Sequence, residues 1–115
     1  MKKTVLIMLS ICLLAILQNC SSSKKVNKTA IVISFDKDVM PILQSRCTPC
    51  HFPPEGRKQA LNTYDAVKAN INEIISRVKM PQEATAFMPF KSKKPPLSDS
   101  LINILQEWQK QNMPQ

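Results

Sequence analysis

The sequence predicts a small all-α domain over residues 31–115, on two observations. Apolar residues recur at intervals of three and four positions in three separate stretches, which is the pattern of a helix with one buried face. Only residues 30–34, AIVIS, have the pattern of a short segment that would run extended along the domain. Strand patterns are nearly absent, and we therefore expect helices to build the core.

The first expected helix runs from Phe35 into the residues that follow Cys47. Pro41 cannot donate an N–H and crowds the carbonyl four residues before it, so the regular helix is expected to begin near Pro41, after a first turn or kink. The apolar face of this segment is formed by Phe35, Val39, Ile42, Leu43 and Cys47.

The second expected helix follows a loop rich in Pro, Glu, Gly and Arg. Thr63 is a suitable N-cap and Pro81 prevents continuation, so this segment forms one helix or two short helices in line. Its apolar face consists of Tyr64, Val67, Ile71, Ile74, Ile75 and Val78.

The third expected helix begins at Ser98, an N-cap residue followed by Asp99 in the first turn, where a negative charge is favourable. Leu97 is placed to pack against Ile102 as a hydrophobic staple. The loop before this helix, residues 80–96, is long and crowded with prolines. The apolar face of the helix comprises Leu101, Ile102, Leu105 and Trp108.

The N-terminus has the pattern of an export signal. Lys2 and Lys3 precede an apolar run over residues 5–17, which has the length of a secretory signal core and is too short for a comfortable membrane span. The run ends in LQNC, and the composition then changes to SSSKKVNKT. This junction resembles the lipobox of bacterial lipoproteins, although Asn19 departs from the smaller residue that the family prefers before the cleavage point.

The lipobox resemblance implies three regions. Residues 1–19 would be a lipoprotein signal peptide, removed by cleavage before Cys20, and residues 20–30 a polar tether that begins with the lipidated Cys20. Residues 31–115 would form the folded domain, exported and held by its lipid on the periplasmic side of a bacterial membrane. The alternative is an uncleaved N-terminal anchor, in which Cys20 has no role.

Two cysteines would remain for chemistry in the folded domain, because the lipobox resemblance implies that Cys12 leaves with the signal and Cys20 carries lipid. They are Cys47 and Cys50, in the motif CTPCH, and the only histidine of the chain, His51, follows directly. A structural zinc site needs about four protein ligands, which these three neighbouring residues do not supply. A thioredoxin-like redox pair would require alternating strands and helices around the motif, which this sequence lacks.

Haem attachment accounts for all three motif residues. Thiols separated by two intervening residues on a helical turn can each add to one vinyl group of the porphyrin, and the adjacent histidine then reaches the iron as its proximal ligand. A chain of this size buries only about 60 to 65% of its unfolded surface, so a covalently held macrocycle would supply much of the apolar centre. The motif therefore predicts one haem c per chain, attached through Cys47 and Cys50 and ligated by His51.

From residue 34 to residue 113 the chain resembles the class I c-type cytochromes. The stretch FDKDVMPILQSRCTPCH is similar to the first helix of small bacterial monohaem cytochrome domains, and FMPF followed by LSDSLINILQEWQKQ is similar to their methionine loop and terminal helix. The resemblance implies an all-helical cytochrome c-like fold wrapped around the haem, with electron transfer and no enzymatic activity. The presence of a single glycine, Gly56, and the proline-rich loop depart from the family pattern.

The sixth iron ligand is expected to be a methionine, because the only histidine is already used and a thioether suits haem iron. Met40 lies too close before the motif to reach the opposite haem face, and Met113 lies near the C-terminus. Met88, in an apolar setting in the middle of the loop, is favoured over Met80. Ordinary filling of the core is the alternative role for these methionines.

Ligation by both His51 and Met88 leaves no vacant position on the iron, which favours electron transfer over chemistry on a bound substrate. Without Met88 as a ligand, the domain would instead be a haem-based sensor or a weak peroxidase with an open sixth position. Without a haem, it would be a thiol-disulfide oxidoreductase.

Further residues are expected to contact the haem or its ligands. A backbone carbonyl of the FPP segment after the motif would accept a hydrogen bond from the second imidazole nitrogen of His51. The candidates for binding the haem propionates are Arg57, Tyr64, Arg77 and Trp108, and the alternative, favoured for each taken singly, is a surface charge or a core aromatic residue.

The charge pattern predicts the partners. The chain carries a formal net charge of +8. Three of its lysines, Lys91, Lys93 and Lys94, follow Met88 closely and would form a positive rim near the haem. Such a rim would attract an acidic redox partner protein. A solvated loop explains the same lysines without a partner. The sequence shows no basic groove interleaved with aromatic residues, so nucleic acid is not an expected partner, and the membrane is contacted through the lipid anchor.

Overall fold

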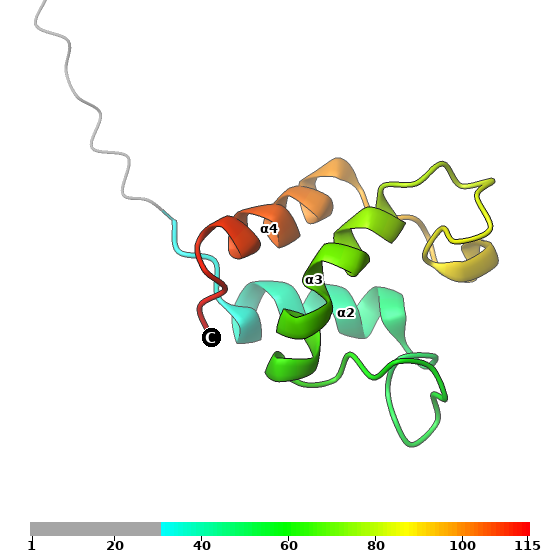
Figure 1. Ribbon diagram of the computed structural model, residues 1–115, viewed down its shortest axis with the longest axis horizontal. Coiled ribbons are helices and arrows are strands. Elements are labelled where there is room, and N and C mark those ends of the chain that lie inside the picture. The colour runs from blue at the N-terminus through cyan, green and yellow to red at the C-terminus, as the bar shows by residue number, and fades with distance from the viewer. Residues whose placement is uncertain (1–30) are drawn as a thin grey trace, which may run out of the picture.

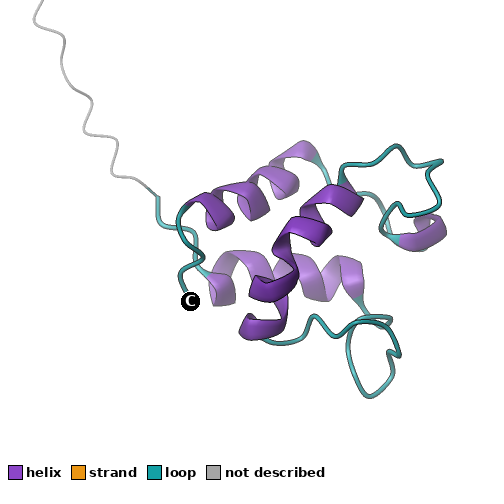
Figure 2. Cartoon of the chain, viewed as in Figure 1, coloured by secondary structure: helices purple, strands orange, loops and turns teal. Residues whose placement is uncertain are grey.

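The computed structural model describes residues 31–115, and this part of the chain consists of helices and loops, with no strand (Figure 2). The predicted all-α class is therefore confirmed. The elements in order are the π-helical turn η1 (Phe35–Val39), α2 (Met40–Cys47), α3 (Tyr64–Val78), the 3-10 turn η2 (Phe90–Ser92) and α4 (Asp99–Lys110) (Figure 1).

The predicted signal peptide, residues 1–19, and the tether with Cys20 lie outside the described residues. Across residues 31–115, no helix is both long enough and apolar enough to cross a membrane. The structure therefore bears on the folded domain alone.

The first helical segment begins at a reciprocal cap. The Ser34 hydroxyl accepts the N–H of Lys37 at 3.4 Å, and the Ser34 N–H donates to Asp38 Oδ2 at 2.8 Å. Regular α-helix then starts at Met40 with Pro41 in its first turn, where a missing N–H breaks no helical bond. The expected start near Pro41, after a first turn, is confirmed.

Helix α3 is one continuous helix, which settles the choice between one helix and two. Thr63 caps it as expected, because its Oγ1 accepts the N–H of Ala66 at 3.3 Å. The buried face of α3 contributes Val67, Ile71, Ile74, Ile75 and Val78 to the core.

Helix α4 begins after Ser98 as expected, but the Ser98 hydroxyl bonds the hydroxyl of Ser100 at 2.8 Å instead of a helix N–H. Leu97 and Ile102 are both buried, in agreement with the predicted staple. Leu101, expected on the buried face, is only partly buried at the edge of the core. The buried face of α4 is made of Ile102, Leu105 and Trp108.

Three aromatic rings join the helices at one end of the domain. Phe35 from η1, Tyr64 from the start of α3 and Trp108 from α4 have ring centroids between 5.4 and 6.1 Å apart. The rings meet in tilted and edge-to-face arrangements, which aromatic pairs prefer. Trp108 is fully buried, and α4 packs against both α3 and η1. We call these three residues the aromatic junction.

The C-terminal tail folds back over the aromatic junction. Trp108 Nε1 donates to the carbonyl of Pro114 at 2.7 Å, and the Tyr64 hydroxyl donates to the carbonyl of Met113 at 2.8 Å. The N–H of Phe35 donates to Pro114 as well, at 3.1 Å. All three junction residues are therefore tied to the last few residues of the chain.

The segment before η1 lies beside the end of α4. Its residues 31–34 have no helical structure, and Ser34 is extended, as expected of AIVIS. The side-chain amide of Gln111 accepts the N–H of Ile33 at 2.9 Å and donates to the carbonyl of Ile31 at 3.1 Å. The chain therefore enters the described domain next to its C-terminus (Figure 1).

The two long loops lie at the other end of the domain. Residues 48–63 connect α2 to α3, and residues 79–98 connect α3 to α4 (Figure 1). Both loops extend beyond the helices on the side away from the C-terminus, and α2 ends on that same side. The motif at the end of α2 and loop 79–98, which we call the methionine loop, therefore lie on that side, whereas the last residues of loop 48–63 return to Tyr64 at the aromatic junction.

Replacing Trp108 by alanine is expected to lower the free energy of unfolding by about 3 to 5 kcal/mol, because it empties a fully buried ring position and removes one of the two hydrogen bonds to the Pro114 carbonyl. Denaturant unfolding followed by circular dichroism measures the change. Lys110→Ala is the matched control on the same helix, since Lys110 makes an exposed ion pair with Glu107, and a change below about 0.5 kcal/mol is expected. Equal effects of the two substitutions would contradict the role assigned to the junction.

Candidate functional site

The motif CTPCH spans the end of α2 and the turn that follows it. Cys47 is the last residue of α2, and the N–H of His51 donates to the Cys47 carbonyl at 3.1 Å. The N–H of Phe52 donates to the carbonyl of Pro49 at 3.0 Å, which tightens the turn. The two thiols and the imidazole therefore leave the backbone within one hydrogen-bonded turn.

The imidazole of His51 is held by a backbone carbonyl across the loop. Its Nδ1 lies 2.7 Å from the carbonyl oxygen of Gln59. A carbonyl can only accept a hydrogen bond, so in the neutral imidazole Nδ1 carries the proton and Nε2 has the lone pair. This is the tautomer in which Nε2 can bind a metal, and the hydrogen bond at Nδ1 fixes the orientation of the ring.

The prediction that a carbonyl of the FPP segment binds His51 is wrong, since Gln59 supplies the carbonyl. The FPP segment turns away because the loop closes on itself, with the N–H of Gly56 donating to the carbonyl of Phe52 at 2.9 Å. The chain then returns along the motif, where the N–H of Leu61 donates to the carbonyl of His51 at 2.9 Å. This return brings Gln59 to the ring.

Gly56, the only glycine of the chain, lies against the backbone of the motif. A Cβ built at this position would overlap the carbonyl oxygens of Pro49 and Cys50. These are backbone atoms of the turn itself, so there is no side chain that could move aside. The position therefore admits glycine alone while the loop stays closed over the motif.

The two motif thiols have different surroundings. Both are free, and Cys50 is exposed, whereas burial raises the pKa of the half-buried Cys47 thiol to about 11. The nucleophilic cysteine of a thiol-disulfide oxidoreductase needs a lowered pKa, so the shift at Cys47 opposes that role for it. Within residues 31–115, no group of three or more His, Cys, Asp or Glu side chains is arranged to hold a metal ion.

Met88 lies in the middle of loop 79–98 and packs, partly buried, against the core. The residues on either side of it, Phe87 and Pro89, are both buried. The N–H of Met88 donates to the carbonyl of Arg77 at 3.3 Å, which ties the loop to the end of α3. Its sulfur therefore belongs to an anchored, apolar segment of the loop.

The other methionines of the domain have different positions. Met80 comes directly after the end of α3 and is half-buried. Met40 is the first residue of α2, about 10 Å along the helix axis from Cys47. Met113 lies in the C-terminal tail at the aromatic junction. Of the four, Met88 combines packing against the core with a place at the loop end of the domain.

One side chain connects the motif to the methionine loop. Arg46, directly before Cys47, donates through Nη1 to the carbonyl of Pro95 at 3.2 Å. The Nε of Arg46 is buried without a hydrogen-bond partner. The end of α2 and loop 79–98 therefore meet at one end of the domain, which is where Figure 1 places both.

Tyr64 and Trp108, two of the candidates for binding the haem propionates, have the alternative role of aromatic residues at the core. Their donor groups bind the C-terminal tail, at the end of the domain away from the motif. Arg77, the third candidate, binds Glu73 at 2.6 Å and the carbonyl of Ala86 at 3.3 Å. Its guanidinium group is thus already engaged in holding the methionine loop.

Sequence reasoning missed Arg46, Gly56 and Gln59 as residues of the site. Gln59 acts through its backbone, and Arg46 acts on a partner 49 positions away, so neither leaves a local signal. The single glycine was a usable signal, because glycine is favoured where two stretches of backbone approach closely. Arg57, the fourth predicted propionate ligand, is exposed in the same loop as Gly56.

The tip of loop 79–98 is exposed and positively charged. Lys91 and Lys93 are exposed and Lys94 is half-buried. The ammonium of Lys91 lies 5.4 Å from the ring centroid of Phe90, which is itself exposed. A charged and aromatic surface therefore follows Met88 within a few residues.

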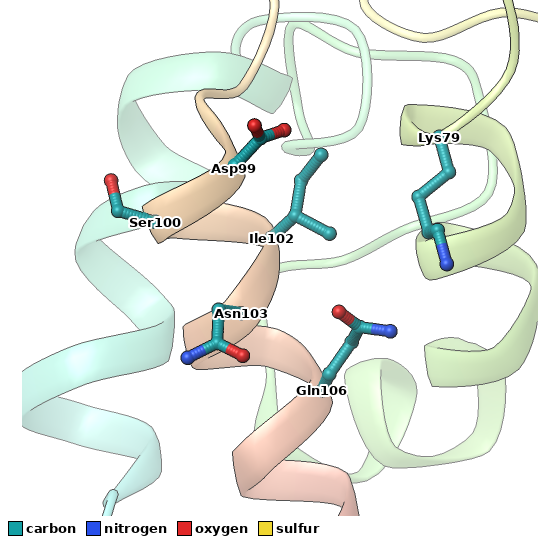
Figure 3. Close-up of a pocket in the computed structure, with 6 residues that line it drawn as sticks. All are labelled: Lys79, Asp99, Ser100, Ile102, Asn103 and Gln106. Carbon is teal, nitrogen blue, oxygen red and sulfur yellow. The ribbon is translucent and has the colours of Figure 1, made fainter.

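A surface groove of about 590 Å³ lies between the end of α3 and the start of α4 (Figure 3). None of the predicted site residues lines it, so the groove is separate from the motif. Its lining consists of Lys79, Asp99, Ser100, Ile102, Asn103 and Gln106.

Comparisons with protein-family models, with curated proteins and with solved structures found no match.

Replacing Gly56 by alanine is expected to lower the free energy of unfolding by about 1 to 3 kcal/mol, because the new Cβ overlaps the motif backbone and forces the loop open. Denaturant unfolding measures this change, and hydrogen exchange at His51 Nδ1 reports the accompanying loss of the bond to Gln59. Glu55→Ala, at the exposed neighbouring position, is the control, with an expected change within about 0.5 kcal/mol. A Gly56→Ala protein as stable as the control would show that the loop does not depend on this close approach.

Proposed function

We propose that this domain is a monohaem c-type cytochrome whose function is electron transfer. In this proposal Cys47 and Cys50 hold one haem c through thioether bonds, and His51 and Met88 are the axial ligands of its iron. The observation that carries the proposal is the hydrogen bond between His51 Nδ1 and the Gln59 carbonyl, because it leaves Nε2 of the motif histidine prepared as a metal ligand.

The donor groups at the loop end of the domain fit a haem. Two free thiols and an imidazole of fixed tautomer share one turn, and the loop that carries the thioether of Met88 meets the same helix end. Imidazole and thioether together are the axial ligands of electron-carrying c-type haems. When bound, the haem would supply reversible one-electron chemistry.

The chain's own residues would set the environment of that chemistry. The Gln59 carbonyl orients His51 and makes its Nε2 a stronger donor. The buried residues Phe87 and Pro89 flank Met88 and would keep the segment that carries its sulfur apolar. Ligation from both sides would leave no position for a substrate, so electron transfer is proposed and enzymatic activity is not.

Two alternatives differ from this proposal in the role of Met88 and of the thiols. A haem-based sensor or weak peroxidase would have an open sixth position, whereas the anchored and partly buried Met88 favours ligation. A thiol-disulfide oxidoreductase without haem would need a reactive thiolate, and the raised pKa of Cys47 leaves the exposed Cys50 for that role.

The partner we propose is an acidic redox protein. Lys91 and Lys93 are exposed next to the exposed ring of Phe90, in the loop that carries Met88. Positive charge would speed encounter with an acidic surface, and the aromatic ring would provide apolar contact once the two proteins meet.

The rate of electron exchange with such a partner should fall as the salt concentration rises, because salt screens the attraction between the two surfaces. A rate that is independent of salt would argue against an acidic partner.

We also propose that the domain is exported and held by a lipid on Cys20 at the periplasmic side of a bacterial membrane. The chain enters the described domain at the end opposite the two loops (Figure 1). Anchorage from that end would leave the motif and the lysine-bearing loop accessible to a partner protein.

Covalent attachment tests the proposed function. When the chain is produced in a host that attaches haem c, the haem should stay with the polypeptide after full denaturation, because thioether bonds survive unfolding. Replacing both Cys47 and Cys50 by alanine should release it, and absorbance of the denatured, gel-filtered chain measures the difference. Haem that extracts from the wild-type chain into acidified organic solvent would overturn the proposal.

A matched pair of methionine variants tests the sixth ligand. Met88→Ala should remove the charge-transfer band of methionine ligation and open the reduced iron to carbon monoxide, because its sulfur no longer fills the sixth position. Met80→Ala should do neither, and absorbance spectra distinguish the two variants. Reversed behaviour would make Met80 the ligand, and carbon monoxide binding by the wild type would favour the sensor or peroxidase.

Cys20→Ala tests the anchor. The variant should move from the membrane fraction to the soluble fraction, or accumulate as an unprocessed precursor, because the thiol that would carry the lipid is absent. Cell fractionation and the mass of the processed chain provide the measurement. Normal processing with unchanged membrane association would rule out lipidation of Cys20.

A further inference from the structure

We infer that Arg77 and Arg46 are positioning residues that hold Met88 in its ligating position. Their guanidinium groups bind the two ends of the loop segment 86–95, which contains Met88. The inference rests on the proposed function, because it concerns how readily Met88 leaves the iron. Two side chains that do not bind the haem would then determine how firmly Met88 is held on the iron.

Arg77 holds the loop on both sides of Phe87. Its Nη1 donates to the carbonyl of Ala86 at 3.3 Å, and its own carbonyl accepts the N–H of Met88 at 3.3 Å. Its Nε binds Glu73 at 2.6 Å, one turn earlier on α3, which fixes the direction of the guanidinium. Phe87, between the two loop contacts, is buried, so the residue before Met88 is held by packing as well as by hydrogen bonds.

Arg46 holds the other end of the segment from α2. Residues 95 and 96 are prolines, which can accept backbone hydrogen bonds but cannot donate them. This end of the segment is held through a carbonyl, because Arg46 Nη1 donates to the carbonyl of Pro95. Arg46 directly precedes Cys47, and its contact with Pro95 therefore joins the motif to the methionine loop. Because its Nε is buried without a partner, the side chain carries a desolvation cost that offsets part of its contribution to global stability.

Between the two arginine contacts, the loop segment has a well-exposed tip. Phe90, Lys91, Ser92 and Lys93 are exposed, and η2 is a single turn with Lys91 at a φ of 49°. A segment with few buried groups opens at a low free energy relative to the core. The fraction of molecules in which Met88 has left the iron should therefore depend on the two arginines.

External imidazole tests this inference, because it binds the oxidised iron only after Met88 has left. The apparent affinity of imidazole equals its intrinsic affinity multiplied by the fraction of molecules in which Met88 has left the iron. Arg77→Lys keeps the charge but cannot make both guanidinium contacts, and Arg46→Lys is one atom too short to reach Pro95 in the same way. Loss of one hydrogen bond should raise the apparent affinity for imidazole roughly fivefold, and the double variant should raise it further.

Two controls separate positioning from a general loss of stability. Lys68→Arg, at an exposed position on the same helix as Arg77, should leave the imidazole affinity unchanged. In a Met88→Ala background, the arginine substitutions should also leave it unchanged, because no methionine has to leave. Denaturant unfolding of each variant shows how far global stability has changed.

A rise in imidazole affinity that requires Met88 would support the inference. Unchanged affinity in both arginine variants, with the haem attached and the methionine band present, would overturn it and leave the proposed function intact. An equal rise in the Met88→Ala background would overturn it too, because the arginines would then act on the site by another route. A wild-type chain without covalent haem would refute the proposed function and this inference together.

Discussion

The aromatic junction of Phe35, Tyr64 and Trp108 is the contact on which the rest of the domain depends. It joins every long helix, since η1 continues directly into α2, and the C-terminal tail closes over it. A domain of this size has little apolar surface with which to build a second core. The helices pack along their buried faces and are joined at one end by this junction. The loops at the other end combine a few buried side chains, such as Phe87, with polar contacts.

Proline determines what kind of polar contact holds the loops. The chain has nine prolines, none of which can donate a backbone hydrogen bond, and both loops are rich in them. Side chains supply donors in their place: His51 binds the carbonyl of Gln59, and Arg46 binds that of Pro95. Arg77 does the same at Ala86. Such contacts link segments that are far apart in the sequence, so the loops hold a defined shape without strands.

The two loops differ in how firmly they hold their proposed ligands. Around His51, backbone hydrogen bonds close the loop, and Gly56 packs against the motif with no room for a side chain. Around Met88, the loop depends largely on two arginine side chains and ends in an exposed tip. In the proposed cytochrome, histidine would thus be the permanent ligand, and the methionine would be held only as firmly as these arginine contacts allow. This asymmetry follows from the location of the only glycine in one loop and of the arginine contacts on the other.

The sequence by itself determined the helices and the chemistry of the motif. Periodicity located the buried faces, Thr63 and Pro41 located helix starts, and CTPCH placed two thiols beside the only histidine, because each of these signals is local along the chain. The tertiary structure alone decided that the Gln59 carbonyl binds the imidazole and that Tyr64 and Trp108 donate hydrogen bonds to the C-terminal tail. It also decided which arginines reach the methionine loop. A side chain's partner in a loop depends on how the backbone returns in space, and no pattern of neighbouring residues encodes a contact between positions as distant as Arg46 and Pro95.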